Sequence, residues 1–235
     1  MKAMAALETA KKFIEVQFPD CDAALLAGSV TRGEETATSD LDIIIFKGEL
    51  SSAYRESLFF DEWPIEVFVH SFTSFQSFFK SDRERGRPSL QKMISEGIVL
   101  RDHEKLNSIK NEASKQLEAG PGKWDDKTIQ LKRYFLSDVL EDFIGCQNRS
   151  EGIFIAGRLA ELLHEFILRT HNQWTGESKW IYRALRNFDE ELAGVFAKAF
   201  DDYYTLGNKS GVVKLTDKVL APFGGRLFEG FSVGK

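Results

Sequence analysis

The sequence predicts an α+β protein in which a mixed sheet flanked by helices is followed by a helical bundle. In the first half, short apolar runs rich in β-branched residues alternate with helical segments, as in a sheet covered by helices. In the second half, apolar residues recur at helical spacing instead. The change occurs at the glycine- and proline-containing stretch Ala119–Gly122. We therefore expect two domains, residues 1–118 and 119–235.

The first half contains the elements expected to build the sheet. Apolar residues at helical spacing predict an opening helix over residues 3–18, closed by Pro19. The polar segment after Gly28 could begin with a turn of helix. Strands are predicted over three short apolar runs: Ala23–Ala27, Leu41–Phe46 and Trp63–His70.

Helices are expected to complete the first half and to form the second. A helix or loop through Tyr54 leads to the third strand. Short helices over Ser74–Lys80 and Ser89–Glu96 are linked by the charged segment Asp82–Pro88, which we expect to be a mobile loop. Beyond residue 122, three apolar stripes at helical spacing predict the bundle; they begin at Leu131, Ile155 and Leu192.

Composition narrows the class of protein. The net charge of −5 argues against a nucleic-acid coat or a polybasic membrane anchor. We expect a cytoplasmic protein, because the two cysteines are far apart and in no CxxC arrangement. No apolar run reaches the length of a membrane span, and the four histidines have no zinc spacing. Neither a membrane nor a nucleic acid is an expected partner.

Two carboxylates stand at the start of a strand that otherwise reads as buried. Asp40 and Asp42 are separated by one leucine, so on a strand they project from the same face, about 6–7 Å apart. Two such charges repel each other and are poorly solvated at a buried strand, whereas Mg²⁺ prefers carboxylate ligands. Glu66 lies off the apolar face of the next strand; alone it would read as an exposed glutamate, but with the aspartates it reads as a third ligand. A basic side chain that already neutralised the three would contradict this hypothesis.

A glycine turn precedes the two aspartates. Gly28 and Ser29 end a strand and can offer backbone N–H groups and a hydroxyl to phosphate oxygens. Arg32, three residues after Ser29, could neutralise a triphosphate, and Gly33 lets the backbone approach closely. By itself this turn is also compatible with an ordinary strand end.

The combination is more specific than its parts. An apolar residue, Gly28-Ser29, ten further residues, Asp40 and Asp42, and then the strand residue Glu66 resemble the signature of the polymerase-β-like nucleotidyltransferase superfamily over residues 24–70. The resemblance implies a nucleotidyltransferase fold for the first domain, a nucleoside triphosphate (with ATP expected) as co-substrate, and two Mg²⁺ ions. It further implies transfer of a nucleoside monophosphate to a hydroxyl of a small-molecule acceptor, with release of pyrophosphate.

The subfamily is indicated by weaker features. The spelling Gly-Ser-Val-Thr-Arg-Gly and the helical second half are similar to small enzymes such as the aminoglycoside (kanamycin) nucleotidyltransferases, so an antibiotic is one possible acceptor. In the kanamycin enzyme a glutamate on a carboxy-terminal helix is the general base. A short local match puts Glu161 in that position, while Glu141 and Asp142 stay open as alternatives.

A basic pair in the second half could bind phosphate. Lys179 and Arg183 are four residues apart near the start of a helix that we expect Ser178 to cap. Cations are unfavourable at a helix amino end, so an anion such as a triphosphate between them would compensate. The alternative is two solvated basic residues beside Trp180.

Two rival functions remain open. The same chemistry could act on a partner protein, as in the antitoxin-like adenylyltransferases of this superfamily, although these are usually much shorter chains. The chain could also be a non-catalytic nucleotide-binding module. The segment Asp82–Pro88 and the bundle helices are expected to form the acceptor pocket, but their side chains do not specify the acceptor.

Overall fold

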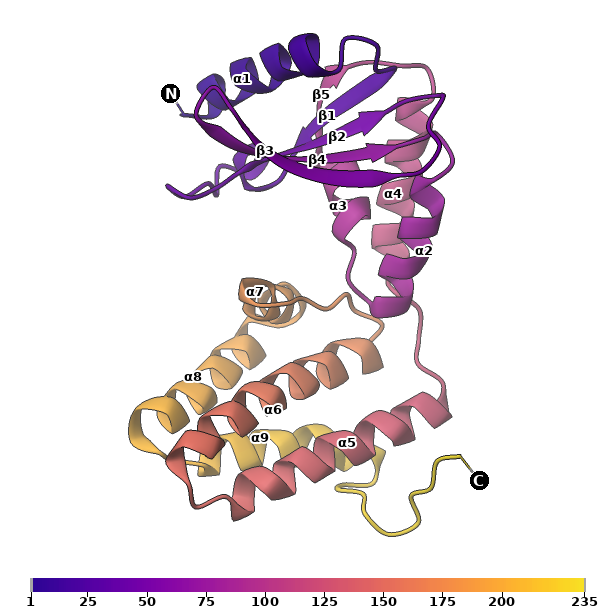
Figure 1. Cartoon of the computed structure of the whole chain (residues 1–235). Helices are drawn as coiled ribbons and strands as arrows, with labels where there is room; N and C mark the ends of the chain where they lie inside the picture. Colours follow the sequence, from indigo (N-terminus) through magenta and orange to yellow (C-terminus); the bar gives the residue numbers. More distant parts are fainter. Residues whose placement is uncertain (1, 235) are drawn as a thin grey trace. The chain divides into compact units, whose positions relative to one another are not determined.

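The computed structural model describes residues 2–234 and divides into two compact units between Ala119 and Gly120 (Figure 1). The described strands all belong to the first unit, and the second unit is helical. The chain therefore has the predicted α+β fold class, with a mixed sheet and a helical carboxy-terminal part.

The first unit is built on a five-stranded sheet with the strand order β3-β4-β2-β1-β5. The central strands β2 and β4 are parallel, and the other neighbouring strands are antiparallel. The elements of this unit are α1 (Lys2–Gln17), β1 (Ala23–Ala27), the short 3-10 helix η1 (Ser29–Arg32), β2 (Leu41–Phe46), β3 (Tyr54–Phe60), β4 (Trp63–His70), α2 (Phe75–Arg85), α3 (Ser89–Glu96), β5 (Ile98–Arg101) and α4 (Leu106–Ala119).

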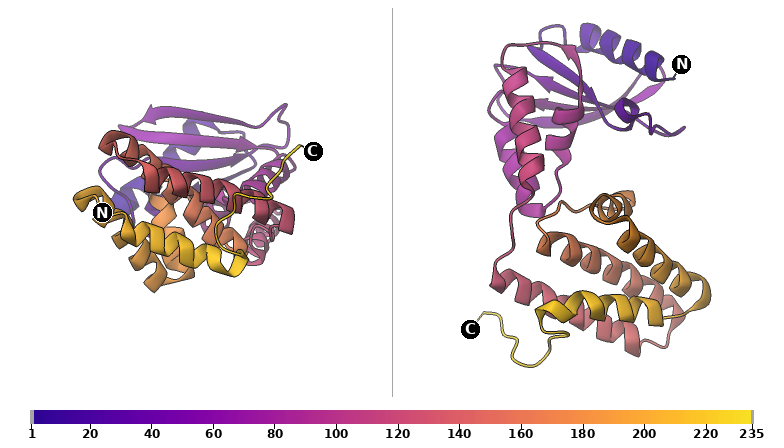
Figure 2. Two further views of the ribbon diagram at one scale, coloured as in Figure 1. Left: turned by 90° about the horizontal axis from the view of Figure 1, so that it is seen from below. Right: turned by 180° about the vertical axis from the view of Figure 1, so that it is seen from behind.

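Both faces of this sheet are covered, because successive strand residues point to opposite sides. On one side, Leu41, Ile43 and Ile45 of β2 belong to a core that includes Phe13 of α1. On the other side, Ile44 belongs to a core with residues of α2, α3 and α4. Figures 1 and 2 show α1 over one face and α2–α4 over the other. Asp42 shares its face with Ile44 and stands where that covered face ends.

Two strands lie outside the sequence-based prediction. The segment through Tyr54, expected as helix or loop, is the edge strand β3, paired with β4. The two strands form a hairpin whose turn residues, Asp61 and Glu62, have φ values of 47° and 66°. Asn-Gly usually marks such a turn, so the Asp-Glu pair conceals it. The four-residue strand β5, at the other edge, is too short to give a periodic signal.

The charged segment expected as a mobile loop is partly helical. Helix α2 continues to Arg85 and ends at Gly86, with φ 71°. The carboxylate of Asp82 is almost fully buried; it pairs with Arg85 and accepts a hydrogen bond of 2.8 Å from the backbone N–H of Leu90. It thereby satisfies one of the free N–H groups at the start of α3. The prediction of a mobile loop was wrong because a charged residue such as Asp82 can be buried and hydrogen-bonded to the start of a helix, as well as solvated in a loop.

The second unit is a bundle whose helices share one apolar core. Helix α6 packs against α5 and α7, and α8 packs against α7 and α9 (Figure 2). Asp125, Asn148 and Asp189 cap three of these helices with side-chain hydrogen bonds to backbone N–H groups. The helices are α5 (Asp126–Gly145), α6 (Arg149–Thr170), α7 (Lys179–Phe188), α8 (Glu190–Leu206) and α9 (Ser210–Leu220), followed by the 3-10 turn η2 (Ala221–Phe223).

Among the described helices, none combines the length and apolar character that a membrane crossing requires.

Candidate metal and phosphate site

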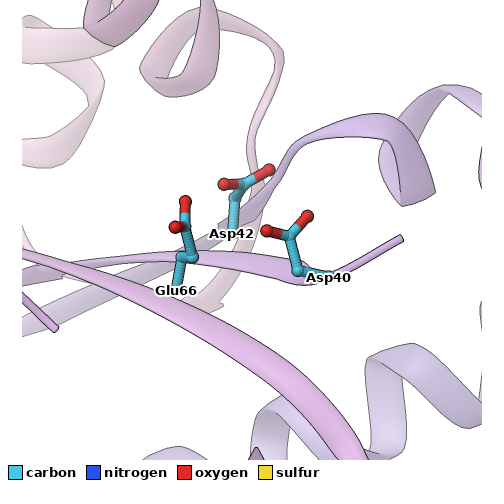
Figure 3. A group of neighbouring side chains, drawn as sticks. All are labelled: Asp40, Asp42 and Glu66. Carbon is cyan, nitrogen blue, oxygen red and sulfur yellow. The ribbon is translucent and has the colours of Figure 1, made fainter. Parts of the chain in front are cut away.

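Three carboxylates from two neighbouring strands converge at one end of the sheet (Figure 3). Asp42 on β2 and Glu66 on β4 are register partners in the parallel pair, so their side chains leave the same face side by side. Asp40 precedes β2 by one residue and turns toward the same point. One carboxylate oxygen from each residue lies within 4.8 Å of the other two.

The electrostatics of this cluster are unfavourable without a cation. Burial raises the pKa of the Asp42 carboxyl from 3.8 to about 7, and the charges of Asp40 and Glu66 add to the shift. Arg55 and Arg32 act in the opposite direction without cancelling it. Three converging carboxylate oxygens are the donor set that hard divalent cations such as Mg²⁺ prefer. The residues present therefore fit a divalent cation.

Gly28 touches this cluster. Ala27, the last residue of β1, is the register partner of Asp42, so the chain turns at Gly28 directly beside the Asp42 carboxylate. A Cβ at position 28 would stand 3.0 Å from Cγ of Asp42 and closer still to its Oδ2. Gly28 also has φ 84°, a backbone conformation that disfavours side chains. Both constraints require glycine here.

The glycine turn continues into η1, as the sequence suggested. The Ser29 hydroxyl donates a hydrogen bond of 3.2 Å to the Ser39 hydroxyl, which ties the turn to the segment that leads into Asp40. Arg32 forms ion pairs with Glu34 at 3.2 Å and Glu96 at 2.9 Å. The guanidinium group of Arg32 thus has carboxylate partners in this structure, and phosphate binding by Arg32 stays a prediction.

Arg55 is the residue of the site that the sequence did not reveal. It lies on β3, and its Nη2 atom contacts both carboxylate oxygens of Glu66. The Ser57 hydroxyl also donates to Glu66 Oε1, at 3.3 Å. Arg55 pairs with one of the three carboxylates and, even together with Arg32, does not neutralise the cluster, consistent with the raised pKa of Asp42. The missed signal was the alternation of Arg55, Ser57 and Phe59 on a strand that the sequence did not predict.

The predicted residues of the second half belong to the second unit. Glu161 is exposed on α6 and pairs with Arg158 at 3.0 Å, and its alternative Glu141 pairs with Arg226 at 2.7 Å. Lys179 is the exposed first residue of α7.

The helix cap predicted there is wrong. Ser178 stands at the cap position of α7 with φ 52°, and its side chain makes no capping hydrogen bond. The guanidinium of Arg183 lies over the ring of the half-buried Trp180, with its central carbon 4.8 Å from the ring centroid. This stacking corresponds to the alternative in which the basic residues flank Trp180, and an anion between Lys179 and Arg183 stays a prediction.

Proteins similar to this chain are found among solved structures. No family model matches the chain, and no curated protein matches it. Among solved structures, the chain is similar to a nucleotidyltransferase-like protein from Exiguobacterium sibiricum 255-15, with a TM-score of 0.49 and 8% sequence identity. The match covers 92% of this chain and 74% of that one.

Proposed function

We propose that the protein is a Mg²⁺-dependent nucleotidyltransferase that transfers a nucleoside monophosphate from a triphosphate, with ATP expected, to a hydroxyl group. The observation that carries the proposal is the convergence of Asp40, Asp42 and Glu66 beside the turn at Gly28. The carboxylates fit divalent cations, and the adjacent turn places the backbone of Gly28, which has no side chain, directly beside them. A cation site beside a phosphate site is the arrangement that phosphoryl transfer requires.

Each residue has a role in this proposal. Asp40 and Asp42 would hold two Mg²⁺ ions, and Glu66 would hold the one nearer the acceptor; bound there, the ions offset charge on the phosphate and acidify the attacking hydroxyl. The Gly28-Ser29 turn would orient the triphosphate through backbone N–H groups and the Ser29 hydroxyl. Arg32 would reach the same phosphates by exchanging its ion pairs with Glu34 and Glu96.

The reaction is a displacement at the α-phosphorus. The acceptor oxygen forms a bond to that phosphorus, the bond to the bridging oxygen breaks, and pyrophosphate leaves. The hydroxyl proton needs a base, for which Glu161 is the proposed residue, with Glu141 and Asp142 as alternatives. Lys179 is proposed to contact the phosphates. The acceptor is proposed to be a small molecule, with an antibiotic as one option.

The test is pyrophosphate release by the purified protein with each of the four labelled nucleoside triphosphates, Mg²⁺ and a panel of hydroxyl acceptors. Asp40→Asn and Asp42→Asn should each lower release by roughly 100-fold or more, since a lost cation ligand removes several kcal/mol of transition-state stabilisation. Glu15→Gln, which removes an exposed acid of α1, should leave release unchanged. Wild-type rates in either aspartate variant would overturn the proposal.

The same assay separates the rival functions. Transfer of label to a protein band and to none of the small molecules would indicate an antitoxin-like adenylyltransferase. Nucleotide binding without release of pyrophosphate under any condition would indicate a non-catalytic module.

A further inference from the structure

Of the three carboxylates, Glu66 forms an ion pair with a basic residue of the same sheet, Arg55 on β3. Arg55 is the register partner of Phe68 on the neighbouring strand, and Ser57 is that of Glu66. The Arg55 side chain runs over Phe68, with its guanidinium carbon 5.0 Å from the ring centroid, and reaches both Glu66 oxygens. Sheet register and ring stacking together aim the guanidinium at this carboxylate.

The pair is unequal in its contact with solvent. The Arg55 side chain is 59% exposed, whereas that of Glu66 is 21% exposed. An exposed guanidinium regains its hydration when it leaves a carboxylate, so breaking such a pair costs little, typically about 1 kcal/mol or less. Glu66, on an inner strand and beside two more carboxylates, is the partner that needs a positive charge nearby.

A divalent cation and the guanidinium would compete for the same carboxylate. A cation bound by all three acids lies within reach of the Glu66 oxygens that Arg55 occupies, and two positive charges at that distance repel each other. The cation can be shared by three carboxylates, while Arg55 pairs with one. The more exposed partner is therefore the one that gives way.

We propose that Arg55 is the counter-ion of Glu66 in the metal-free protein and is exchanged for the divalent cation when the cation binds. The proposal rests on the proposed function, because it assumes that the three carboxylates bind a cation. Arg55 offsets the charge of Glu66 before a cation binds and then leaves the carboxylate, and its side chain returns to solvent beside β3.

The first test is Mn²⁺ binding, measured by isothermal titration and by the free-Mn²⁺ electron paramagnetic resonance signal. Arg55→Gln removes the competing charge and should tighten binding by about five-fold, the factor that corresponds to ~1 kcal/mol for an exposed pair. Arg55→Lys keeps the charge but loses the contact with both Glu66 oxygens, so its Mn²⁺ affinity should lie between those of the wild type and Arg55→Gln. Lys12→Gln is the matched control, since Lys12 is also exposed and pairs with Asp61, which is not one of the three carboxylates.

The second test follows the guanidinium itself. In nitrogen-15 spectra, assigned with Arg55→Lys, the Arg55 Nε–H resonance should move toward the position of a solvated arginine as Mg²⁺ is added. A purely structural ion pair would not respond to Mg²⁺.

The outcomes are distinct. Unchanged or weaker Mn²⁺ binding by Arg55→Gln, or an Arg55 resonance that ignores saturating Mg²⁺, would overturn the exchange while leaving the cation site intact. A wild-type protein and an Arg55→Gln variant that both fail to bind Mn²⁺ would overturn the proposed function, and this inference with it. Circular dichroism of each variant verifies that it is folded.

Discussion

Asp42 carries a destabilising charge in the metal-free protein, so Asp42→Asn should raise its thermal stability. Asparagine has nearly the same shape and removes the charge that burial and the two neighbouring acids oppose. The folded-state pKa of Asp42 is raised from 3.8 to about 7. Below about pH 4 the Asp42 carboxyl is protonated in both the folded and the unfolded protein, so it costs no stability. As the pH rises from about 4 through 7, the unfolded protein loses this proton more readily than the folded one, and the free energy of unfolding falls.

The size of the effect follows from that shift. About 3 pKa units at ~1.4 kcal/mol each give an upper limit of ~4 kcal/mol above pH 7. Water entry and movement of the acids relieve part of this, so we expect a gain of ~2 kcal/mol for Asp42→Asn at pH 8. In a domain of about 100 residues, this raises the midpoint of thermal unfolding by roughly 10 °C.

The measurement is thermal unfolding by circular dichroism with excess chelator, at pH 8 and at pH 4.5. The advantage of Asp42→Asn over the wild type should be largest at pH 8 and should shrink at pH 4.5, where the wild-type carboxyl is already protonated. Glu15→Gln, an exposed acid in the same unit, controls for net charge and should show no such pH-dependent gain. An unchanged or lower midpoint for Asp42→Asn at pH 8 would refute the electrostatic argument.

Two further predictions concern glycine and arginine positions. Gly28→Ala should abolish Mn²⁺ binding in a titration, because the added Cβ overlaps the Asp42 carboxylate. Gly33 has φ 67° and open space around it, so Gly33→Ala should lose ~1 kcal/mol of stability and keep Mn²⁺ binding. Equal Mn²⁺ binding by both variants would contradict the role given to the turn at Gly28. The Arg133 guanidinium donates hydrogen bonds to the backbone carbonyls of Gly224 (2.7 Å), Gly225 (2.6 Å) and Arg226 (3.2 Å). Arg133→Gln should therefore release the carboxy-terminal segment, measured as faster amide hydrogen exchange after residue 223. Unchanged exchange there would mean that other contacts hold the segment.

The sequence was informative where one physical signal dominated. Strands β1, β2 and β4 have predicted bounds that match the structure, because apolar residues dominate each of them. All of β1 is buried, while β2 and β4 each carry one acid of the cluster among their buried residues. The convergence of Asp40, Asp42 and Glu66 was also predictable, since a period of two fixes the face and a parallel neighbour brings the third acid alongside.

The sequence was uninformative where the decisive contact was tertiary. Edge strand β3 has one exposed face, polar residues and an atypical turn, so its register with β4 exists only in the folded sheet. Arg55 could not be assigned to Glu66 without that register. Asp82 reads as a loop residue until its contact with the start of α3 is known.

The residues that the sequence predicts and the residue that it does not predict, Arg55, contribute differently to the candidate site. The acids and Gly28 define where a cation could bind, and they are encoded by strand period and by one required backbone conformation. Arg55 offsets the charge of one of these acids, Glu66, from the neighbouring strand and from eleven positions away in the sequence. Because the acids repel one another whenever the cation is missing, a chain that keeps them needs a compensating charge that can also leave. An exposed arginine on an edge strand satisfies both conditions, which a buried one would not.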